Sequence, residues 1–184
     1  MRVLTLVCAA VLIPSLAFAV VPDPTLSDTP DCVRIFPNAT LTLDGQVIGN
    51  NALPLGGDAV RLIFSASCTA LWDCDNPPNP PTVYSIISNP DGTYAFAPAA
   101  GGCCDVSISA SIEADPGAVT LNVYGAVGSA DNTGDGQVTL GDFVTFQSHF
   151  GTDNECSDLD GSCNVTVSLA DFVVFQSMFG TGCP

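Results

Sequence analysis

The sequence has no lysine, and its basic residues are three arginines and one histidine, against 19 acidic residues in a chain of 184. The formal net charge of −16 excludes nucleic acid and anionic membranes as partners, because no basic patch exists to displace the counterions of a phosphate backbone. Cations are the partners that this charge favours. The hydrophobic content of 47% is too high for an acidic disordered tail, so we expect a folded chain.

Long apolar runs are also missing after the N-terminus, where none approaches the roughly 18 to 20 residues that span a bilayer. At the N-terminus, Arg2, the apolar stretch Val3–Leu16 and the A-x-A motif Ala17–Ala19 are typical of a secretory signal peptide over residues 1–19. An uncleaved N-terminal anchor is the alternative. We therefore expect a secreted protein, extracellular or at the cell surface and not inserted in a membrane. Its mature chain would carry a charge of −17 (2 basic minus 19 acidic residues).

Eight cysteines remain after residue 19, and in an exported protein an even number indicates disulfides. A zinc site is the rival interpretation, but the mature chain has no C-x-x-C pair and a single histidine, His149. The candidate local pairings are Cys68 with Cys74, Cys32 with Cys103 or Cys104, and Cys183 with Cys156 or Cys163.

Short apolar segments separated by turn residues over residues 33–127 predict a mainly β fold. The clearest hairpin alternates apolar and polar residues over Val106–Ile112 and Val119–Val123, around a turn at Ala114–Gly117. We therefore predict an immunoglobulin-like (Ig-like) β-sandwich over residues 20–128, with a barrel as the alternative. Further predicted elements are a hairpin of Leu41–Leu43 and Val47–Ile48 around Asp44-Gly45, a hairpin of Val83–Ile87 and Tyr94–Phe96 around Asn89–Gly92, and a buried face of Val60, Leu62 and Phe64.

After Ser129 the alternation stops and an internal repeat begins, which predicts a second, small α-helical unit over residues 129–184. Residues 131–152 align without gaps with residues 160–181, at a period of 29 and with 12 identities in 22 positions. In each copy a polar loop leads into a helical pattern with Phe at i, i+3 and i+7. We expect the two aromatic stripes to pack against each other: Phe143, Phe146 and Phe150 with Phe172, Phe175 and Phe179.

Cap signals predict where these two helices begin and end. Thr139 with Asp142 and Ser168 with Asp171 have the spacing of a capping box, with Asp in place of the preferred Glu. Glycine follows the last Phe of each stripe, as is typical just after a helix C-terminus.

The loop before the first helix matches a calcium loop, which needs oxygen ligands at positions 1, 3, 5 and 12, a carbonyl at position 7 and Gly at position 6. Gly136 stands at position 6. Carboxylates crowded together without a basic neighbour must bind protons or a cation, and magnesium is disfavoured because it demands a tight octahedron. The predicted ligands are Asp131, Thr133, Asp135, the Gln137 carbonyl and Asp142.

The second loop is a weaker match, and its occupancy is left open. Val165 replaces the glycine, and a β-branched residue is strongly disfavoured at positive φ. An alternative register uses Asp158, Asp160 and Ser162, with extra residues before Asp171, and a disulfide through Cys163 could replace part of the ordering by a metal. In the repeat register the predicted ligands are Asp160, Ser162, Asn164, the Thr166 carbonyl and Asp171.

The duplicated loop and exit helix, GDFVTFQSHFG and ADFVVFQSMFG, resemble a dockerin over residues 129–183. The resemblance implies a helix pair folded around calcium that docks on a cohesin-type β-domain. Dockerins often carry polar partner-binding residues at loop positions 10 and 11, where this chain has Leu140-Gly141 and Leu169-Ala170. The mature chain also resembles small exported bacterial proteins in which an Ig-like, invasin-repeat-like domain precedes such a pair.

No catalytic constellation stands out, so we expect a non-catalytic binding or assembly protein, associated with polysaccharides by family analogy. His149 corresponds to Met178 in the second copy, and Glu113 with Asp115 is expected at a solvated hairpin tip. The predicted partner is a cohesin-like β-domain or another copy of the chain. The alternatives are a self-assembling surface or filament subunit, and a carbohydrate-binding accessory protein; in the latter Trp72, Tyr84 and Tyr94 would form the stacking surface, although core packing is expected for them.

Overall fold

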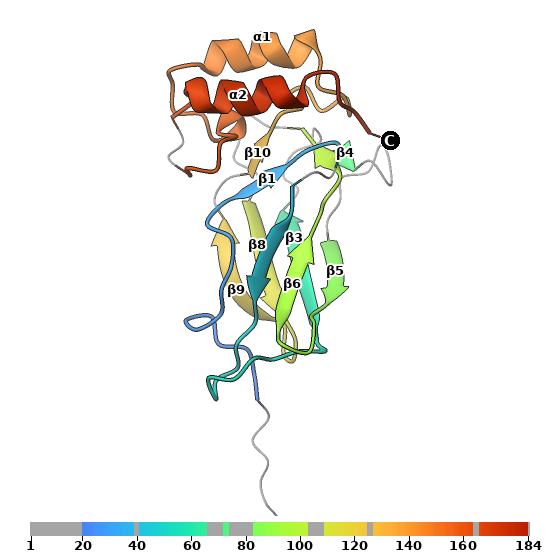
Figure 1. Ribbon diagram of the computed structural model, residues 1–184, viewed down its shortest axis with the longest axis vertical. Coiled ribbons are helices and arrows are strands. Elements are labelled where there is room, and N and C mark those ends of the chain that lie inside the picture. The colour runs from blue at the N-terminus through green and yellow to red at the C-terminus, as the bar shows by residue number, and fades with distance from the viewer. Residues whose placement is uncertain are drawn as a thin grey trace, which may run out of the picture.

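The computed structural model (Figure 1) describes residues 20–38, 41–65, 72–73, 83–102, 109–124, 127–163 and 166–183. The predicted signal peptide, the Cys68 and Cys74 pairing and the Asn164 ligand lie outside these residues. No helix among the described residues is long and apolar enough to cross a membrane.

The described chain is mainly β, with two helices at one end of the β part (Figure 1). A four-stranded antiparallel sheet has the order β5-β3-β8-β9, and three two-stranded pairs accompany it: β2-β6 and β4-β7, which are antiparallel, and β1-β10, which is parallel. The strands are β1 (Val33–Ile35), β2 (Leu43–Gln46), β3 (Ala59–Ser65), β4 (Trp72–Asp73), β5 (Val83–Ile87), β6 (Thr93–Phe96), β7 (Ala100–Gly101), β8 (Ser109–Ala114), β9 (Val119–Tyr124) and β10 (Val127–Ser129).

The main core lies between the four-stranded sheet and the β2-β6 pair. Because side chains alternate across a strand, every second residue of β3 and β8 points inward. The predicted buried face of β3 is confirmed, with Val60 and Leu62 fully buried and Phe64 2% exposed. The hairpin of β8 and β9 is confirmed as well over the described residues. From the opposite side the core is closed by Leu43, Tyr94 and Phe96.

The other two predicted hairpins are wrong. Asp44 and Gly45 do not form a turn but lie inside β2, paired with β6. The glycine is required there by space, because a Cβ at Gly45 would collide with the Asp28 carbonyl and the Tyr94 ring. Asn89–Gly92 does reverse the chain, with a bond of 2.8 Å from Gly92 N to Asn89 O, but it leads from β5 in one sheet to β6 in another.

The two predicted helices are present as α1 (Leu140–His149) and α2 (Leu169–Met178), with a short 3-10 helix, η1 (Glu155–Ser157), in the connection. Both capping boxes form as predicted, at Thr139 and at Ser168. Gly151 and Gly180 follow the helix ends at positive φ, 76° and 82°, a conformation that glycine adopts without strain.

The aromatic stripes pack against each other as predicted through their first two Phe residues. The third, Phe150 and Phe179, are about half-exposed and meet the rings of Phe146 and Phe175 in their own helices. Phe146 and Phe175 are almost fully buried and stack with ring centroids 5.0 Å apart, and Phe143 and Phe172 flank them at about 6 Å. Offset ring pairs of this kind add to the free energy of burial, by about 0.5 to 1.5 kcal/mol each.

Backbone bonds also tie each repeat to the other. Val138, in the first loop, donates to Thr181 O at 2.8 Å and accepts from Gly180 N at 2.8 Å, beyond the second helix. Val167, in the second loop, makes the equivalent bonds with residues 151 and 152, beyond the first helix, at 2.8 and 2.9 Å. Each loop is therefore closed by the chain that follows the other helix.

The helical unit is joined to the β part by packing and by a disulfide. Phe36, just after β1, is buried in the helical core, and β10 crosses the predicted boundary at residue 128. Cys32 is bonded to Cys163, which corrects its predicted pairing with Cys103 or Cys104 and excludes a bond between Cys163 and Cys183. Cys156 and Cys183 are disulfide-bonded as well. The predicted pairings kept Cys32 within the β part and Cys163 within the helical unit, whereas the observed bond links the two units, at a sequence separation of 131 residues.

Candidate metal centre

Three carboxylates of the first loop converge on one point. Asp131 follows β10, Asp135 lies in the loop, and Asp142 occupies the first turn of α1. Each offers an oxygen, and these oxygens lie within 4.8 Å of one another. Asp131 and Asp142 are fully buried, whereas Asp135 is exposed, so the cluster opens to solvent on one side.

The backbone of the loop is wrapped around Asp131. Its Oδ1 accepts bonds from Gly134 N (2.7 Å) and Asp135 N (3.2 Å), and its Oδ2 accepts one from Gly136 N (2.8 Å). Gly136 has a φ of 82°, so the sharp turn expected at position 6 is present. Gly101 lies against the Asp131 carboxylate, and a larger residue would not fit there, because a Cβ at residue 101 would lie 2.5 Å from Asp131 Oδ2.

Thr133 and Asp142 complete this arrangement. The Thr133 hydroxyl donates to Asp142 Oδ1 at 2.9 Å and lies 3.4 Å from Asp131 Oδ1, so it stands between the two buried carboxylates. The other oxygen of Asp142 accepts from the Thr139 backbone N at 2.7 Å in the capping box. Asp142 therefore serves both the helix start and the acidic cluster. Gln137, the predicted carbonyl ligand, lies in a backbone bridge with Gly182.

Burial of Asp131 makes this cluster electrostatically unfavourable without a cation. Desolvation, together with the charge of Asp142, raises the pKa of Asp131 to about 6, although the backbone N–H donors of Gly136, Gly134 and Asp135 act in the opposite direction. A divalent cation between the three carboxylates would relieve both the burial and the repulsion.

A second acidic cluster lies before α2. It consists of Asp158, Asp160 and Asp171, with ligand oxygens again within 4.8 Å of one another. Asp160 and Asp171 belong to the predicted ligand set, and Asp158 comes from the alternative register. The predicted set omits Asp158 because the gapless alignment of the two copies begins at Asp160. The sequence signal for Asp158 is its Asp-x-Asp spacing with Asp160.

Two other predicted ligands of the second loop, Ser162 and Thr166, lie within the described residues. Ser162 is exposed and donates its backbone N to Asp160 Oδ1 at 2.7 Å. Thr166, whose carbonyl is the predicted ligand, lies in a backbone bridge with Asp153, and its hydroxyl donates to Asp153 Oδ1 at 2.7 Å.

Asp171, in the first turn of α2, is surrounded by hydrogen-bond donors. Burial would raise its pKa, but backbone bonds from Asp160, Ser168 and Leu159 and the Ser168 hydroxyl together hold the pKa below its usual value. The donors are close, with Leu159 N at 2.6 Å and Asp160 N at 2.9 Å from Oδ1. This carboxylate is therefore stabilised in its charged form by the fold itself.

Both clusters offer only hard oxygen ligands, because their converging side chains are carboxylates. Such a set suits calcium or magnesium rather than zinc or copper, which prefer nitrogen and sulfur. The site residues therefore fit a group II cation, and the two acidic clusters could each hold a metal ion.

Other side chains singled out in the sequence have structural contacts. His149 Nδ1 lies 2.9 Å from the hydroxyl of Ser157, which is buried and donates to Asn132 Oδ1 at 3.1 Å. Asp115 pairs with Arg61 at 2.5 Å, and this bond lowers the pKa of the carboxyl.

Two of the three aromatic residues considered for a carbohydrate surface pack with the core. Tyr94 is 3% exposed and donates to Asp28 O at 3.2 Å. Tyr84 is partly buried against the core and meets Phe64 edge-on. The Trp72 side chain lies outside the described residues.

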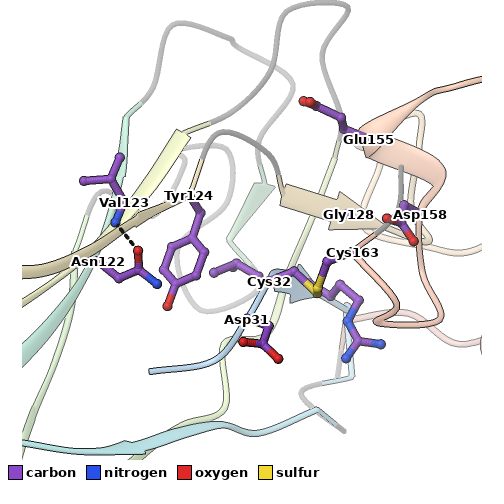
Figure 2. A pocket seen from close by; sticks show the side chains of 11 residues that line it. Asp31, Cys32, Asn122, Val123, Tyr124, Gly128, Glu155, Asp158 and Cys163 are labelled. Carbon is purple, nitrogen blue, oxygen red and sulfur yellow. Dashed lines mark hydrogen bonds between the residues drawn. A yellow bond between two sulfur atoms is a disulfide. The ribbon is translucent and has the colours of Figure 1, made fainter. Parts of the chain in front are cut away.

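A cavity of about 220 Å³ lies where the β part meets the second loop (Figure 2). Its lining includes Arg34, the disulfide of Cys32 and Cys163, and three acidic residues, Asp31, Glu155 and Asp158. The cavity thus adjoins the second acidic cluster.

Comparisons with known proteins give no match, whether to a protein-family model, to a curated protein or to a solved structure. The function of the chain is therefore inferred from its residues and their geometry.

Proposed function

We propose that this chain is a secreted, non-catalytic binding or assembly protein in which calcium stabilises a dockerin-like helix pair beside an Ig-like sandwich. The observation that carries the proposal is the first acidic cluster. It combines three converging carboxylates, a positive-φ glycine at the sixth position and a capping carboxylate at the twelfth. The duplicated capped helices and the two facing β layers support the architecture.

Calcium acts mainly on folding in this proposal. An ion present at 100 times its dissociation constant adds about 2.7 kcal/mol to the state that binds it. In a unit built from two ten-residue helices, that is a large share of what a small core supplies.

The helix pair supports a docking role because several large apolar side chains are exposed on it. Large apolar side chains are normally buried, and a contiguous exposed group of them marks an interaction site. A groove beside it is lined by Leu140, Phe143, Phe172, Phe175, Gln176 and Phe179. The exposed side chains, which occupy equivalent positions in the two repeats, are Leu140, Val144, Phe150, Leu169, Val173 and Phe179, at 49% to 67% exposure. We propose that a β-domain of another protein covers this surface.

Thermal unfolding and far-ultraviolet circular dichroism of the full oxidised chain, in calcium and in EDTA, test the calcium dependence. Asp135→Asn should abolish the stabilisation by calcium, because it removes a cluster carboxylate that is exposed and has little packing. Asp44→Asn, the same change at an exposed residue of β2, should leave it intact. Identical helicity and melting in calcium and EDTA would refute the proposal.

Docking has a separate test. A captured protein supports the proposal if its binding region is a β-domain and if binding is lost both in EDTA and in a Val144→Asp, Val173→Asp double variant. The alternative partner is a second copy of the chain, and light scattering on the pure protein tests it. A calcium-dependent increase in mass that the same double variant abolishes would show that the chain docks on itself.

A further inference from the structure

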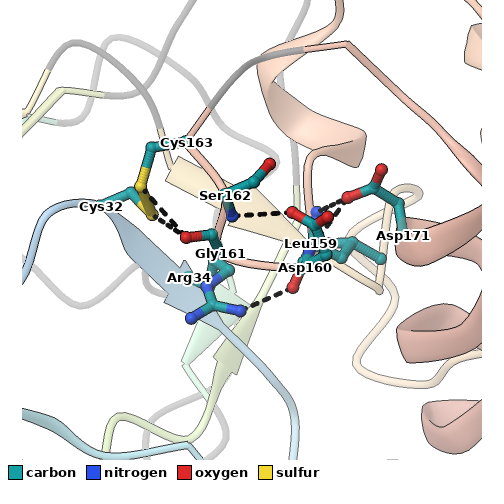
Figure 3. Close-up of a disulfide and its surroundings, with 8 residues drawn as sticks. All are labelled: Cys32, Arg34, Leu159, Asp160, Gly161, Ser162, Cys163 and Asp171. Atoms are coloured by element: carbon teal, nitrogen blue, oxygen red, sulfur yellow. Dashed lines mark hydrogen bonds between the residues drawn. A yellow bond between two sulfur atoms is a disulfide. The ribbon is translucent and has the colours of Figure 1, made fainter.

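The two acidic clusters have the same number of carboxylates but differ in their basic neighbours. Of the two arginines in the described residues, Arg61 pairs with Asp115 in the β part. Arg34 lies against the second loop instead, where Nη1 donates to Leu159 O at 2.7 Å (Figure 3). The charge that acts on Asp131 in the first cluster is that of another carboxylate.

The Arg34 guanidinium is held in this position by its surroundings. Its backbone is paired with Gly128 between β1 and β10, and Cys32, two residues earlier, is bonded to Cys163 of the second loop. Gly161 provides the space, because a Cβ at that residue would lie 2.5 Å from Arg34 Nη2. Figure 3 shows the side chain directly beneath the loop that carries Asp160. Strand pairing and the disulfide thus hold the positively charged Arg34 side chain against this loop.

The charge balance of the two loops differs as a result. Arg34 is half-buried, and burial lowers its pKa, an effect that the charges of Asp158, Asp160 and Asp171 offset only in part. The guanidinium remains charged at any physiological pH. Three carboxylates and one guanidinium carry a charge of −2, against −3 for the first cluster, and a divalent ion in the second loop would be repelled by the nearby positive charge.

We propose that Arg34 is the resident cation of the second loop, so that this loop keeps its fold without a metal and the chain binds a single calcium ion, in the first loop. This inference rests on the proposed function, since it assigns the calcium to one of two similar acidic sets. The disulfide at Cys163 acts with Arg34, because it anchors the loop to the strand that carries the guanidinium.

Calcium calorimetry and native mass spectrometry of the full oxidised chain test this assignment, with Arg34→Gln and Arg61→Gln as a matched pair. The wild type and Arg61→Gln should bind one ion. Arg34→Gln should bind two, with the affinity of the second loop raised at least about tenfold by loss of the repelling charge. An Arg34→Gln chain that is folded and still binds one ion would overturn the proposal.

Two carboxylate variants test the assignment without altering Arg34. Asp135→Asn should bind no calcium, whereas Asp160→Asn should bind one ion with unchanged affinity. Calcium binding that persists in Asp135→Asn, or weakens tenfold or more in Asp160→Asn, would overturn the role of Arg34. Two ions on the wild type would refute this inference alone, whereas none would refute the proposed function with it.

Discussion

If calcium binds in the first loop as proposed, protons should compete with it for Asp131 and give the calcium affinity a measurable pH dependence. Burial, with the charge of Asp142, raises the pKa of Asp131 to about 6 in the metal-free fold, and a carboxylate must be deprotonated to bind a metal. Lowering the pH from 7 to 5 therefore protonates most of the metal-free sites. The calcium affinity should fall about tenfold over this range, which corresponds to about 1.4 kcal/mol.

Isothermal titration calorimetry in two buffers with different protonation enthalpies measures this competition. The number of protons released per calcium ion should rise from about 0.1 at pH 7 to about 0.9 at pH 5. A dissociation constant that stays unchanged from pH 7 to pH 5, with no proton release, would refute the reasoning.

In EDTA, where no metal is bound, a fall in pH should instead stabilise the fold through the same carboxylate, Asp131. Its pKa in the folded protein lies above the unfolded value of 3.8, so its stabilising contribution is fully present below about pH 3.8 and is lost as the pH rises through 6. Comparison with Asp131→Asn isolates this contribution from the other carboxylates. Between pH 7 and pH 5 the unfolding free energy of the wild type should gain about 1.4 kcal/mol relative to the variant. No gain, or a loss, would show that burial does not raise this pKa.

Three further predictions concern stability and are measured by urea unfolding. Phe146→Ala should lower the unfolding free energy by about 3 to 5 kcal/mol, because the ring is 1% exposed. Its control, Val144→Ala on the exposed side of the same helix, should lower it by less than about 0.5 kcal/mol. Equal effects of the two substitutions would contradict the packing described. Thr139→Ala should cost about 1 kcal/mol through loss of the capping box, and an unchanged midpoint would argue against it. Replacing Cys32 and Cys163 together by Ser should cost up to about 5 kcal/mol, the loop-closure value for residues 131 apart, and less if the other disulfides already restrict the unfolded chain. A double variant as stable as the wild type would refute this.

The helical unit could be predicted closely because its signals are local. The capping boxes at Thr139 and Ser168 and the spacing of the Phe residues each lie within one loop and one helix, and α1 and α2 begin where these signals indicate. The hairpin of β8 and β9 was predictable for the same reason, since its strands are adjacent in sequence. Identity and spacing of nearby residues determine such elements.

Contacts between distant segments could not be predicted in this way. Gly45 looks like a turn residue, but its role depends on Tyr94, which reaches it from β6. Arg34 contacts Leu159 from 125 residues away, and nothing near the second loop indicates that a basic residue will arrive there. Asp158 enters only through the alternative register of the second loop, because comparing the two copies assumes that the second loop has the length of the first.

The crossed backbone bonds between the repeats constrain the order in which this protein can be assembled during synthesis. Val138 needs Gly180 and Thr181, and Gly136 O accepts from Cys183 N at 2.9 Å. The first loop thus depends on residues that follow the second helix and are synthesised after it. A nascent chain that ends just after the second helix would already contain every carboxylate of both clusters, and Val167 could pair with residues 151 and 152, yet the first loop would still lack the partners that close it.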